Sequence, residues 1–432
     1  MFTKINWCFF MTKLQAIRGM HDILTHETPN WQFVEKKIQY ILNQYAYKEI
    51  RLPILEKTEL FENSIGGNTD IVSKEMYSFE DKNKMSLTLR PEGTASCVRA
   101  GIEHGLFHNK TQRLWYIGPM FRYERPQKGR QRQFHQLGIE AFGLKGPDVD
   151  AEQIMMSNRI WKELNIKNIN LEINSLGTTE SRKNYRKILV DYFTDNKNKL
   201  DDDSLVRLET NPLRILDSKN SEMKSLIANA PSISEYHDSE SKDHFAQLTE
   251  ILEHGNIKFT INSKLVRGLD YYGKTVYEWT TTELGTQDTV CAGGRYDNLI
   301  ENHGSASTPA VGFAIGIERL LELINFENTL DESTPQIYLL ISGKNIEKHG
   351  LLLAEEIRNQ LPDVKILTNC GNESLKSQFK KADKSGAEIA LVLAEDELEK
   401  KELTVKYLRK EKAQITIKWN EISNFLNKTL FN

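Results

Sequence analysis

The sequence has few cysteines and no long hydrophobic run, and these two absences exclude several classes of protein. Four cysteines occur in 432 residues, far apart in the chain, so no pair shows the spacing of a zinc site or of a disulfide framework. We therefore expect free thiols in a reducing cytoplasm. No stretch approaches the roughly 20 apolar residues that a membrane-spanning helix needs, so we expect no membrane partner.

An excess of charge of one sign is also missing. The 57 basic and 60 acidic residues give a formal net charge of −3. Non-specific DNA-binding proteins are usually strongly basic, so we expect no DNA partner, although a local basic patch can still bind another nucleic acid. The hydrophobic content of 39% and the charged content of 27% are typical of a globular protein, and the length predicts two or three domains.

The first residues, MFTKINWCFF, are apolar but too short to cross a bilayer. A short signal sequence is one interpretation, but no cleavage site of small residues follows. We favour an N-terminal extension over residues 1–11, either disordered or arising from a start codon upstream of Met11.

The most informative stretch is residues 121–143, FRYERPQKGRQRQFHQLGIEAFG. Apolar runs flank a basic segment, which is the pattern of two antiparallel strands joined by a positively charged loop. Such a loop suits a polyanion, either a nucleoside triphosphate or the end of a nucleic acid. The sequence has neither a Gly-x-x-x-x-Gly-Lys-Ser/Thr loop nor a convincing dinucleotide fingerprint. ATP would therefore bind on a sheet between arginine side chains and not at a helix N-terminus.

The order of predicted elements indicates an α+β protein. A strand pattern at 49–55 includes Pro53, which should lie at a sheet edge or an interface. Further strand patterns at 86–90, 114–118 and 168–175 predict an antiparallel sheet with helices packed on it. Residues 178–255 are polar and helical and read as an insertion. After a linker at 326–335, strands and helices alternate over 336–432, which predicts a separate α/β domain with a mixed sheet.

Several segments together resemble a known family. Phe121-Arg122-x-Glu124 with Phe134 resembles the second signature motif of class II aminoacyl-tRNA synthetases, and residues 316–319, GIER, resemble the third. Three further segments are similar to the histidyl-tRNA synthetase family in particular: residues 18–22 (RGMHD), 90–94 (RPEGT) and 265–272 (LVRGLDYY). The motifs occur in the family's order, and the resemblance runs from about Thr12 to the end of the chain.

The resemblance implies a class II catalytic domain with an antiparallel sheet over 12–177 and 256–325. The helical insertion at 178–255 interrupts it, and an anticodon-binding domain occupies 336–432. The implied reaction is the ATP-dependent ligation of L-histidine to tRNA(His) through a histidyl-adenylate, releasing AMP and pyrophosphate. Mg²⁺ would accompany ATP, held largely by phosphate and water with no assigned metal ligand from the protein. The family also implies a cytoplasmic homodimer.

The resemblance also assigns an ATP site. Arg122 would hold the α-phosphate and Arg319 the far end of ATP, since a guanidinium stays charged and binds phosphate oxygens in pairs. Phe134 would stack on adenine, Glu124 would accept from its amino group, and Arg130 would reach the β- or γ-phosphate. From the residues alone, Phe134 is equally well a core side chain, and Glu124 a partner of a neighbouring arginine, Arg122 or Arg125.

The family pattern places the histidine substrate beside this site. Glu92, Thr94 and Gln136 would bind its ammonium group. The two nitrogens of an imidazole need distinct partners, and Glu140 and Tyr272 match the positions that supply them. The remaining histidine-binding residues that we predict are Tyr271, Tyr296 and Arg267.

Arg267 is, with Arg122, the predicted catalytic residue. In the family pattern it lies beside the reacting α-phosphate, and its alternative role is that of a buried partner of Asp270. The turn at 293–297, GGRYD, matches another family segment, and its two glycines would allow close approach of a ligand.

Two rival functions remain open at this point. One is a noncatalytic relative of the synthetase that regulates histidine biosynthesis as a binding subunit. Such proteins commonly lack the terminal α/β domain and depart from the catalytic motifs. This sequence has the terminal domain and keeps the catalytic motifs. The other is a class II ligase for a different amino acid, which Glu140 and residues 265–272 disfavour.

Overall fold

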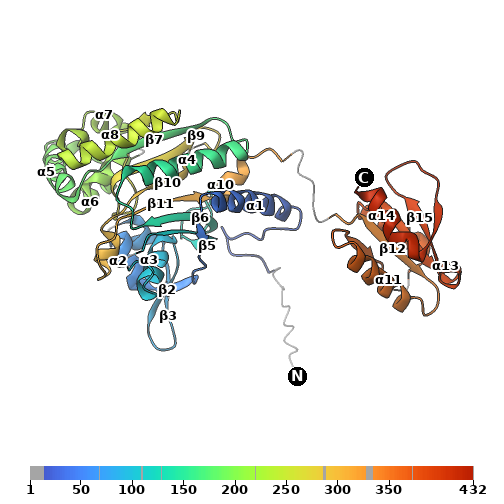
Figure 1. Ribbon diagram of the computed structural model, residues 1–432. Helices are drawn as coiled ribbons and strands as arrows, with labels where there is room; N and C mark the ends of the chain where they lie inside the picture. The colour runs from blue at the N-terminus through green and yellow to red at the C-terminus, as the bar shows by residue number, and fades with distance from the viewer. Residues whose placement is uncertain are drawn as a thin grey trace, which may run out of the picture. The chain divides into compact units, whose positions relative to one another are not determined.

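The computed structural model describes residues 14–67, 69–108, 110–127, 129–218, 220–285, 289–326, 334–371 and 373–431. The chain divides into two compact units, Met1–Phe326 and Glu327–Asn432, which are described separately (Figure 1). The predicted extension at 1–11 and most of the predicted linker at 326–335 lie outside the described residues.

The first unit is built on a large sheet, which in the described part of the chain has the order β1-β5-β6-β11-β10-β9-β7-β8. Its interior pairings are antiparallel. At the two edges, the short strand β1 pairs in parallel with β5, and the short strand β8 pairs in parallel with β7. The predicted antiparallel sheet of an α+β fold is therefore confirmed. The strands are β1 (Lys48–Glu49), β5 (Gln112–Phe121), β6 (Gln133–Phe142), β7 (Ile169–Ser175), β8 (Thr260–Ile261), β9 (Gly273–Thr281), β10 (Thr289–Arg295) and β11 (Ala310–Gly316).

Alternation along the strands divides the sheet into two faces. Side chains of a strand point to opposite faces in turn. In β6, Leu137, Ile139 and Ala141 join one core cluster, whereas Phe142 belongs to another. The first cluster includes residues of three helices that cover this face: α1 (Thr28–Gln44), α4 (Pro147–Glu163) and α8 (Ser239–His254) (Figure 1). The polar side chains of these strands therefore lie on the opposite face, together with the second core cluster.

The opposite face carries α3 and three helices of the predicted insertion, α5, α6 and α7, whereas α8 of the insertion packs on the first face. Buried Tyr185, Leu189 and Phe193 of α5 pack in the second core cluster together with Val276 of β9. The limits of the insertion remain a prediction. The further helices of this unit are α2 (Thr58–Ile65), α3 (Thr94–Glu103), α5 (Thr179–Asp195), α6 (Asp202–Thr210), the 3₁₀ helix η3 (Pro212–Asp217), α7 (Lys224–Ala228), α9 (Leu299–Asn302) and α10 (Ile317–Glu322).

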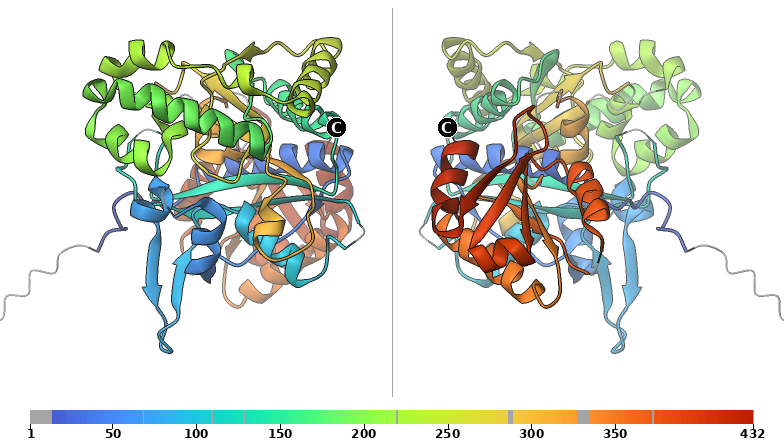
Figure 2. Two further views of the ribbon diagram at one scale, coloured as in Figure 1. Left: turned by 90° about the vertical axis from the view of Figure 1, so that its left-hand side faces the viewer. Right: turned by 90° about the vertical axis from the view of Figure 1, so that its right-hand side faces the viewer.

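A smaller sheet of β2 (Leu55–Lys57), β4 (Ser86–Leu89) and β3 (Tyr77–Glu80) also belongs to this unit. Its β3–β4 hairpin projects outward (Figure 2). The single strand predicted over 49–55 is wrong, because β1 and β2 are separated by an irregular segment. Pro53 has no N–H for a ladder, and the carbonyls of Leu52 and Pro53 instead accept hydrogen bonds from Arg90 Nη1 at 3.0 and 3.3 Å.

The second unit is a mixed sheet of order β13-β12-β14-β15-β16, with β12 parallel to β13 and β14 and the other pairs antiparallel. α11 and α14 pack on one face and α12 on the other. The predicted α/β domain with a mixed sheet is confirmed. Its elements are β12 (Ile337–Ser342), α11 (Glu347–Gln360), β13 (Ile366–Thr368), α12 (Leu375–Lys384), β14 (Ile389–Ala394), α13 (Glu395–Lys400), β15 (Glu402–Tyr407), β16 (Ile415–Lys418) and α14 (Ile422–Leu430).

None of the helices in the described part of the chain combines the length and the apolar character needed to cross a membrane.

Candidate active site

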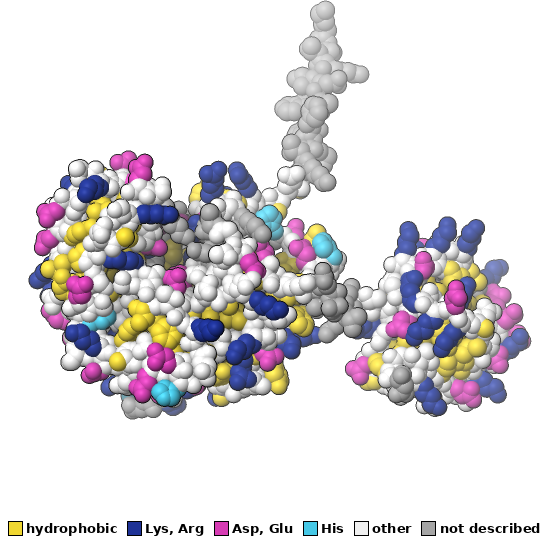
Figure 3. Space-filling model, turned by 90° about the horizontal axis from the view of Figure 1, so that it is seen from above, with side chains coloured by type: hydrophobic (Ala, Val, Ile, Leu, Met, Phe, Trp, Pro, Cys, Tyr) yellow, Lys and Arg dark blue, Asp and Glu magenta, His cyan; other side chains and the backbone are white. Residues whose placement is uncertain are grey.

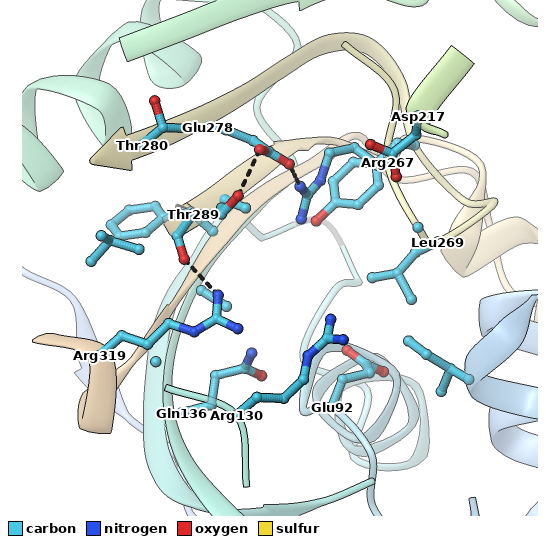
Figure 4. A pocket seen from close by; sticks show the side chains of 18 of the residues that line it. Glu92, Arg130, Gln136, Asp217, Arg267, Leu269, Glu278, Thr280, Thr289 and Arg319 are labelled. Carbon is cyan, nitrogen blue, oxygen red and sulfur yellow. Dashed lines mark hydrogen bonds and ion pairs between the residues drawn. The ribbon is translucent and has the colours of Figure 1, made fainter. Parts of the chain in front are cut away.

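A cavity of about 520 Å³ lies on the polar face of the large sheet (Figure 4). Strands β6, β9, β10 and β11 form its floor, and the 265–272 segment and the start of α3 contribute walls. Charged and polar side chains line it in unusual number for a protein interior. Those that bear on the argument are Glu92, Thr94, Arg122, Glu124, Arg130, Gln136, Asp217, Arg267, Glu278, Thr289, Glu318 and Arg319.

The β5–β6 hairpin places Arg122 and Phe134 together. Antiparallel pairing sets Met120 opposite Phe134, and just beyond the ladder the N–H of Arg122 donates to the carbonyl of Arg132 at 2.9 Å. Arg122 Nε donates to the carbonyl of Pro91 at 2.9 Å, and its guanidinium lies 5.3 Å from the ring centroid of Phe134. The hairpin therefore presents a cation and an aromatic face side by side.

Glu124 and Arg130 face each other across the same hairpin. Their side chains form an ion pair between Glu124 Oε2 and Arg130 Nε. Glu124 is nearly covered, whereas the Arg130 side chain is 41% exposed. The alternative that Glu124 pairs with Arg122 or Arg125 is therefore wrong, because the turn between the strands brings Arg130 back over the carboxylate.

Arg319 links two parts of the cavity rim. It lies at the start of α10, where Nε donates to the carbonyl of Gly129 at 2.8 Å and Nη1 donates to the carbonyl of Thr289 at 2.6 Å. The adjacent Glu318 points to another partner, because its carboxylate accepts from the backbone N–H of His135 at 2.8 Å and contacts the ring of His135 at 3.0 Å. Glu318 is thus held by His135, whereas the Arg319 side chain lies over the cavity.

Arg267 lies on the opposite wall and points into the cavity (Figure 4). Nη1 forms an ion pair with Glu278 Oε1, and the other oxygen of Glu278 accepts from the Thr289 hydroxyl at 3.0 Å. Burial alone would lower the pKa of the Arg267 guanidinium, but the negative charge of Glu278 leaves that pKa above its ordinary value. The alternative pairing of Arg267 with Asp270 is wrong, since the carboxylate that holds it comes from β9.

Glu92 is fixed at the beginning of α3. Its two carboxylate oxygens accept from the backbone N–H groups of Thr94 and Ala95 at 2.7 and 2.8 Å. The side chain is buried, and this burial raises the pKa of the carboxyl group despite both hydrogen bonds. The result is an oriented acid at the edge of the cavity, ready to meet a cationic group.

Glu140 lies deeper, within a cluster of hydroxyl groups. Oε1 accepts from Tyr116 at 2.9 Å and from Thr94 at 2.8 Å, and Oε2 accepts from Tyr296. Burial raises the pKa of this carboxyl group to about 8, although the three hydroxyl groups oppose the shift. The three hydroxyl groups thereby fix the orientation of this carboxyl group.

Aromatic rings surround this acid. The rings of Tyr271 and Tyr272 lie 4.7 Å apart, and those of Tyr271 and Tyr296 lie 5.5 Å apart, measured between centroids. All three side chains are buried. They provide flat, largely apolar walls with a few hydroxyl groups, which suits a small aromatic ring that carries nitrogen atoms.

Two glycines leave the room that this cluster needs. A Cβ atom at Gly312 would lie 1.8 Å from Oε2 of Glu140, and one at Gly138 would lie 2.1 Å from Cζ of Tyr116. The close approach of a ligand to the glycines at 293 and 294 stays a prediction, and the structure shows a packing reason for both. A Cβ at Gly293 would meet the carbonyl oxygen of Gly312 at 2.5 Å, and one at Gly294 would meet a carbonyl of β9 at 2.4 Å, so both permit close packing between strands.

The structure brings the predicted site residues together. Eleven of them line the cavity, namely Glu92, Thr94, Arg122, Glu124, Arg130, Phe134, Gln136, Arg267, Tyr271, Tyr272 and Arg319. Glu140 and Tyr296 do not line it: Glu140 accepts a hydrogen bond from Thr94, which does, and Tyr296 donates to Glu140.

Sequence reasoning missed Glu278, Thr289 and Asp217. The strand pattern gave one usable signal, because Glu278 alternates with the core residues Tyr277 and Trp279 and must therefore face away from them. Asp217 comes from the insertion and had no such signal.

Comparison with known proteins matches both units. A family model described as histidyl-tRNA synthetase matches residues 19–320, and one described as anticodon binding domain matches residues 336–429. A histidine–tRNA ligase of Hydrogenovibrio crunogenus is 53% identical over 420 residues, covering 97% of this chain and 98% of the relative.

Solved structures show the same likeness. The crystal structure of apo S. aureus histidyl-tRNA synthetase is 34% identical, with a TM-score of 0.79, and the match covers 95% of this chain and 99% of that one. A Bacillus halodurans protein described as an ATP phosphoribosyltransferase regulatory subunit/histidyl-tRNA synthetase is 19% identical, with a TM-score of 0.63, and the match covers 89% and 98% of the two chains. The latter likeness concerns the fold alone.

Proposed function

The chain belongs to the histidyl-tRNA synthetase family, and on that premise we propose a role for each side chain in the cavity. The enzyme ligates L-histidine to tRNA, using ATP and passing through a histidyl-adenylate. The observation that carries our assignment is the convergence of Arg122, Arg267 and Arg319 on one cavity, beside the hydroxyl cluster around Glu140.

ATP lies along the β5–β6 hairpin in this proposal. Adenine stacks on Phe134, and Glu124 accepts from its amino group. Arg122 holds the α-phosphate, and Arg130 and Arg319 hold the β- and γ-phosphates. Each of these guanidinium groups makes contacts within the protein that a phosphate can replace with stronger charge-assisted hydrogen bonds. The hairpin therefore supplies both the aromatic face and the cations of the nucleotide site.

Adenylate formation needs positioning and charge neutralisation more than covalent help. An oxygen of the histidine carboxylate attacks the α-phosphorus, a new O–P bond forms, and the bond to the β-phosphate oxygen breaks to release pyrophosphate. The attacking carboxylate is already ionised, so no general base is required. Arg267 and Arg122 stabilise the negative charge that accumulates on the α-phosphate oxygens. Glu278 and Thr289 position Arg267, one through its ion pair and the other by orienting that carboxylate.

The amino acid is held at both ends. Its ammonium group binds Glu92, Thr94 and Gln136 at the start of α3 and on β6. Its imidazole binds between the tyrosine rings, with Glu140 and Tyr272 as the partners of the two nitrogens. An apolar side chain in this pocket would leave the buried carboxyl and hydroxyl groups without partners, which costs far more than a poor steric fit.

Arg267, Tyr271 and Tyr296 complete the set of side chains that we assign to the histidine site. Tyr271 contributes a ring face to the cavity wall, and Tyr296 packs against that ring from behind while its hydroxyl group donates to Glu140. Arg267 reaches the site from the 265–272 segment, where the carboxylate of histidine meets the α-phosphate. Binding of the amino acid and neutralisation of the reacting phosphate thereby share one guanidinium.

Mg²⁺ enters this proposal with ATP as part of the substrate. Among the described residues no group of three or more Asp, Glu, His and Cys side chains has the geometry of a metal site. The carboxylates nearest the nucleotide are engaged, Glu124 with Arg130 and Glu318 with His135. The donor set therefore suits an ion held mainly by phosphate oxygens and water, which is the usual form of Mg²⁺ bound with a nucleotide.

The second unit is proposed to bind the anticodon of tRNA(His). Figure 3 shows Lys and Arg side chains spread over the visible surface of this unit, interspersed with Asp and Glu. On α12, Lys376, Lys380 and Lys384 give a basic helix that can contact phosphates, and Lys381 is paired with Glu373. We further propose that the enzyme acts as a homodimer in the cytoplasm.

The decisive experiment is ATP–pyrophosphate exchange with each of the twenty amino acids. We expect exchange with histidine alone, because only an imidazole satisfies the buried acid and hydroxyl groups together. Exchange that requires another amino acid would overturn the assignment of the pocket. Absence of exchange in a folded, tRNA-binding protein would instead favour the noncatalytic alternative.

A further inference from the structure

A second cavity, of about 350 Å³, lies on the other side of the 265–272 segment. We call it the rear cavity. Its walls are the first two turns of α5, the region around η3 and the rear of the 265–272 segment. Nothing in the roles proposed above uses it.

The rear cavity is strongly basic. Arg182, Lys183, Arg186 and Arg214 line it, against one acidic side chain, Asp270. Arg182 and Lys183 lie four and three positions before Arg186 along α5, so each of them shares a helical face with Arg186. Arg182 lies at the end of the first turn of this 17-residue helix, where the aligned peptide dipoles favour negative charge.

Arg182 is charged, largely buried and without a carboxylate. Its Nη1 donates to the carbonyl oxygen of Tyr272, and within the described residues no carboxylate lies within ion-pair distance of it. Burial lowers the pKa of this guanidinium, and the more distant negative charge of Asp270 only partly offsets that effect. A guanidinium cannot give up its proton at physiological pH, so the remaining way to relieve the cost of burial is an anion.

Asp270 does not serve as that anion. Its Oδ1 accepts from Asn211 Nδ2 at 2.6 Å, and in the described structure it forms no ion pair with Arg182 or Arg214. Burial raises the pKa of its carboxyl group in spite of both arginines. Arg214 reaches two carboxylates at long range, with Nη2 3.7 Å from Asp70 Oδ2 and 4.0 Å from Asp217 Oδ2. The charge of Arg214 is therefore partly compensated, whereas Arg182 has no carboxylate at ion-pair distance in the described residues.

The rear cavity shares a wall with the active site. Arg267, Leu269 and Tyr272 line both cavities. Arg182 holds the carbonyl of Tyr272, and Arg214 packs so close to the backbone of Gly268 that a Cβ there would lie 2.6 Å from its Nη1. An anion that draws Arg182 and Arg214 together would therefore act on the segment that presents Arg267 and Tyr272.

We propose that the rear cavity binds a phosphate group and that its occupation holds the 265–272 segment in place. The second half of this statement rests on the roles proposed above for Arg267 and Tyr272, whereas the first half does not. Arginine forks match the oxygens of phosphate in shape and charge. The group comes either from a free phosphate ion or from the backbone of bound tRNA.

The test compares two variants that each remove two positive charges. K183Q/R186Q removes exposed cations from the rear cavity, and K187Q/K197Q removes exposed lysines of the same region that do not line it. Inorganic phosphate is titrated calorimetrically into the full chain at low ionic strength. A non-hydrolysable histidyl-adenylate analogue fills the active site during the titration. Hydrogen exchange of residues 265–272 is measured with and without phosphate, and tRNA affinity is measured against salt concentration.

For a free ion, we expect K183Q/R186Q to bind phosphate about 10- to 100-fold more weakly, as for the loss of one or two charge-assisted hydrogen bonds. K187Q/K197Q should bind it as the unaltered enzyme does, and phosphate should slow exchange in the 265–272 segment except in K183Q/R186Q. For a tRNA phosphate, K183Q/R186Q should instead show a shallower salt dependence of tRNA affinity than K187Q/K197Q does.

Two results would overturn the proposal. One is equal phosphate binding by the unaltered enzyme and K183Q/R186Q. The other is no phosphate binding to any of the three proteins, together with identical salt dependence of tRNA affinity in the two variants. Unchanged phosphate binding in an enzyme that lacks pyrophosphate exchange would leave the rear site standing and reject only the proposed active site.

Discussion

The two halves of the active-site cavity are held together in different ways. In the histidine half, Glu92 and Glu140 are 3% and 1% exposed and accept hydrogen bonds from neighbours in the fold. In the nucleotide half, the Arg130 side chain is 41% exposed and rests on a single carboxylate. Arg319 rests on two backbone carbonyls. The amino-acid pocket is thus built before its ligand arrives, while the nucleotide site is completed by its ligand.

This difference follows from the chemistry of the two ligands. An imidazole differs from other side chains in only two nitrogens, so the pocket gains selectivity from fixed, buried partners whose loss is costly. A triphosphate is highly charged and recognised by any well-placed cluster of cations, so the guanidinium groups can remain at the surface until it binds. Substitutions in the two halves should therefore separate cleanly into effects on histidine and effects on ATP.

The largest effect is expected at the junction of the two halves. Replacing Arg267 by alanine removes the cation beside the reacting phosphate, so we expect adenylate formation to fall about 100- to 1,000-fold. Histidine affinity should fall much less than the rate, because Glu92 and Glu140 still hold the ammonium group and the imidazole. Pyrophosphate exchange measures the first quantity and equilibrium binding the second.

Glu278→Gln is the matched control, because it removes the charge that orients Arg267 and leaves the guanidinium present. Its loss of rate should be smaller than that of Arg267→Ala. Normal exchange in Arg267→Ala would reject the role assigned to this arginine.

The next largest effect should be confined to the histidine half. In Gly138→Ala the new methyl group would lie 2.1 Å from Tyr116 Cζ and displace the ring that donates to Glu140. Overpacking of this kind costs about 1–3 kcal/mol, so we expect histidine to bind about 10- to 100-fold more weakly. The affinity for ATP, measured separately, should stay the same.

Tyr116→Phe separates the two causes, since it removes the hydroxyl group without crowding the ring. A weaker histidine affinity in Gly138→Ala but not in Tyr116→Phe would show that space matters here and the hydrogen bond does not. An equal loss of ATP affinity in Gly138→Ala would contradict the separation of the two halves.

The protonation of Glu140 allows the histidine half to be tested in the absence of any ligand, through the pH dependence of protein stability. The pKa of its carboxyl group is about 8 in the folded protein and 4.5 for an ordinary glutamate. The group's contribution to stability is therefore full below pH 4.5 and is lost as the pH rises through about 8. Relative to Glu140→Gln, the unaltered protein should lose about 1–3 kcal/mol of unfolding free energy between pH 6 and pH 8.5.

Urea unfolding of both proteins at the two pH values, in the absence of histidine, measures this change. Glu124→Gln in the nucleotide half serves as the reference for removing a carboxylate elsewhere in the cavity. A stability difference between Glu140→Gln and the unaltered protein that does not vary with pH would mean that Glu140 is ionised in the empty pocket.

The smallest effect should belong to Arg130. Because its side chain is partly exposed and its ion pair is accessible to water, Arg130→Gln should weaken ATP binding by only about five- to tenfold. Histidine affinity should be unchanged. Separate titrations with ATP and with histidine measure the two affinities. If Arg130→Gln loses histidine affinity and keeps ATP affinity, the two halves of the cavity are not independent.

Sequence reasoning found the site through motifs and not through geometry. Arg122, Phe134 and Arg319 were grouped because their segments resemble those of one family, and the antiparallel hairpin that joins two of them followed from alternating residues. Their partners were harder to predict. Glu124 pairs with Arg130, and Arg267 pairs with Glu278, because the fold brings separate strands and loops to one rim. No local pattern encodes that arrangement.

The fold itself was predictable where periodicity is strong. The antiparallel sheet, the helical region and the second α/β unit follow from regular alternation of apolar residues. The segment at 49–55 was misread as one strand because its apolar residues look continuous. The carbonyls of Leu52 and Pro53 accept hydrogen bonds from Arg90, which is distant in sequence, so no local pattern indicates the interruption of the strand.

The two hydrogen bonds of Arg319 have a consequence for the choice of nucleotide. This side chain links the hairpin tip at Gly129 to the start of β10 at Thr289 through hydrogen bonds to the two backbone carbonyls. In the proposed ATP site, the terminal phosphates would replace these carbonyl contacts of Arg319. A nucleotide that lacks those phosphates, such as AMP, would leave the link between Gly129 and Thr289 in place, so one arginine would both bind the end of ATP and discriminate against shorter nucleotides.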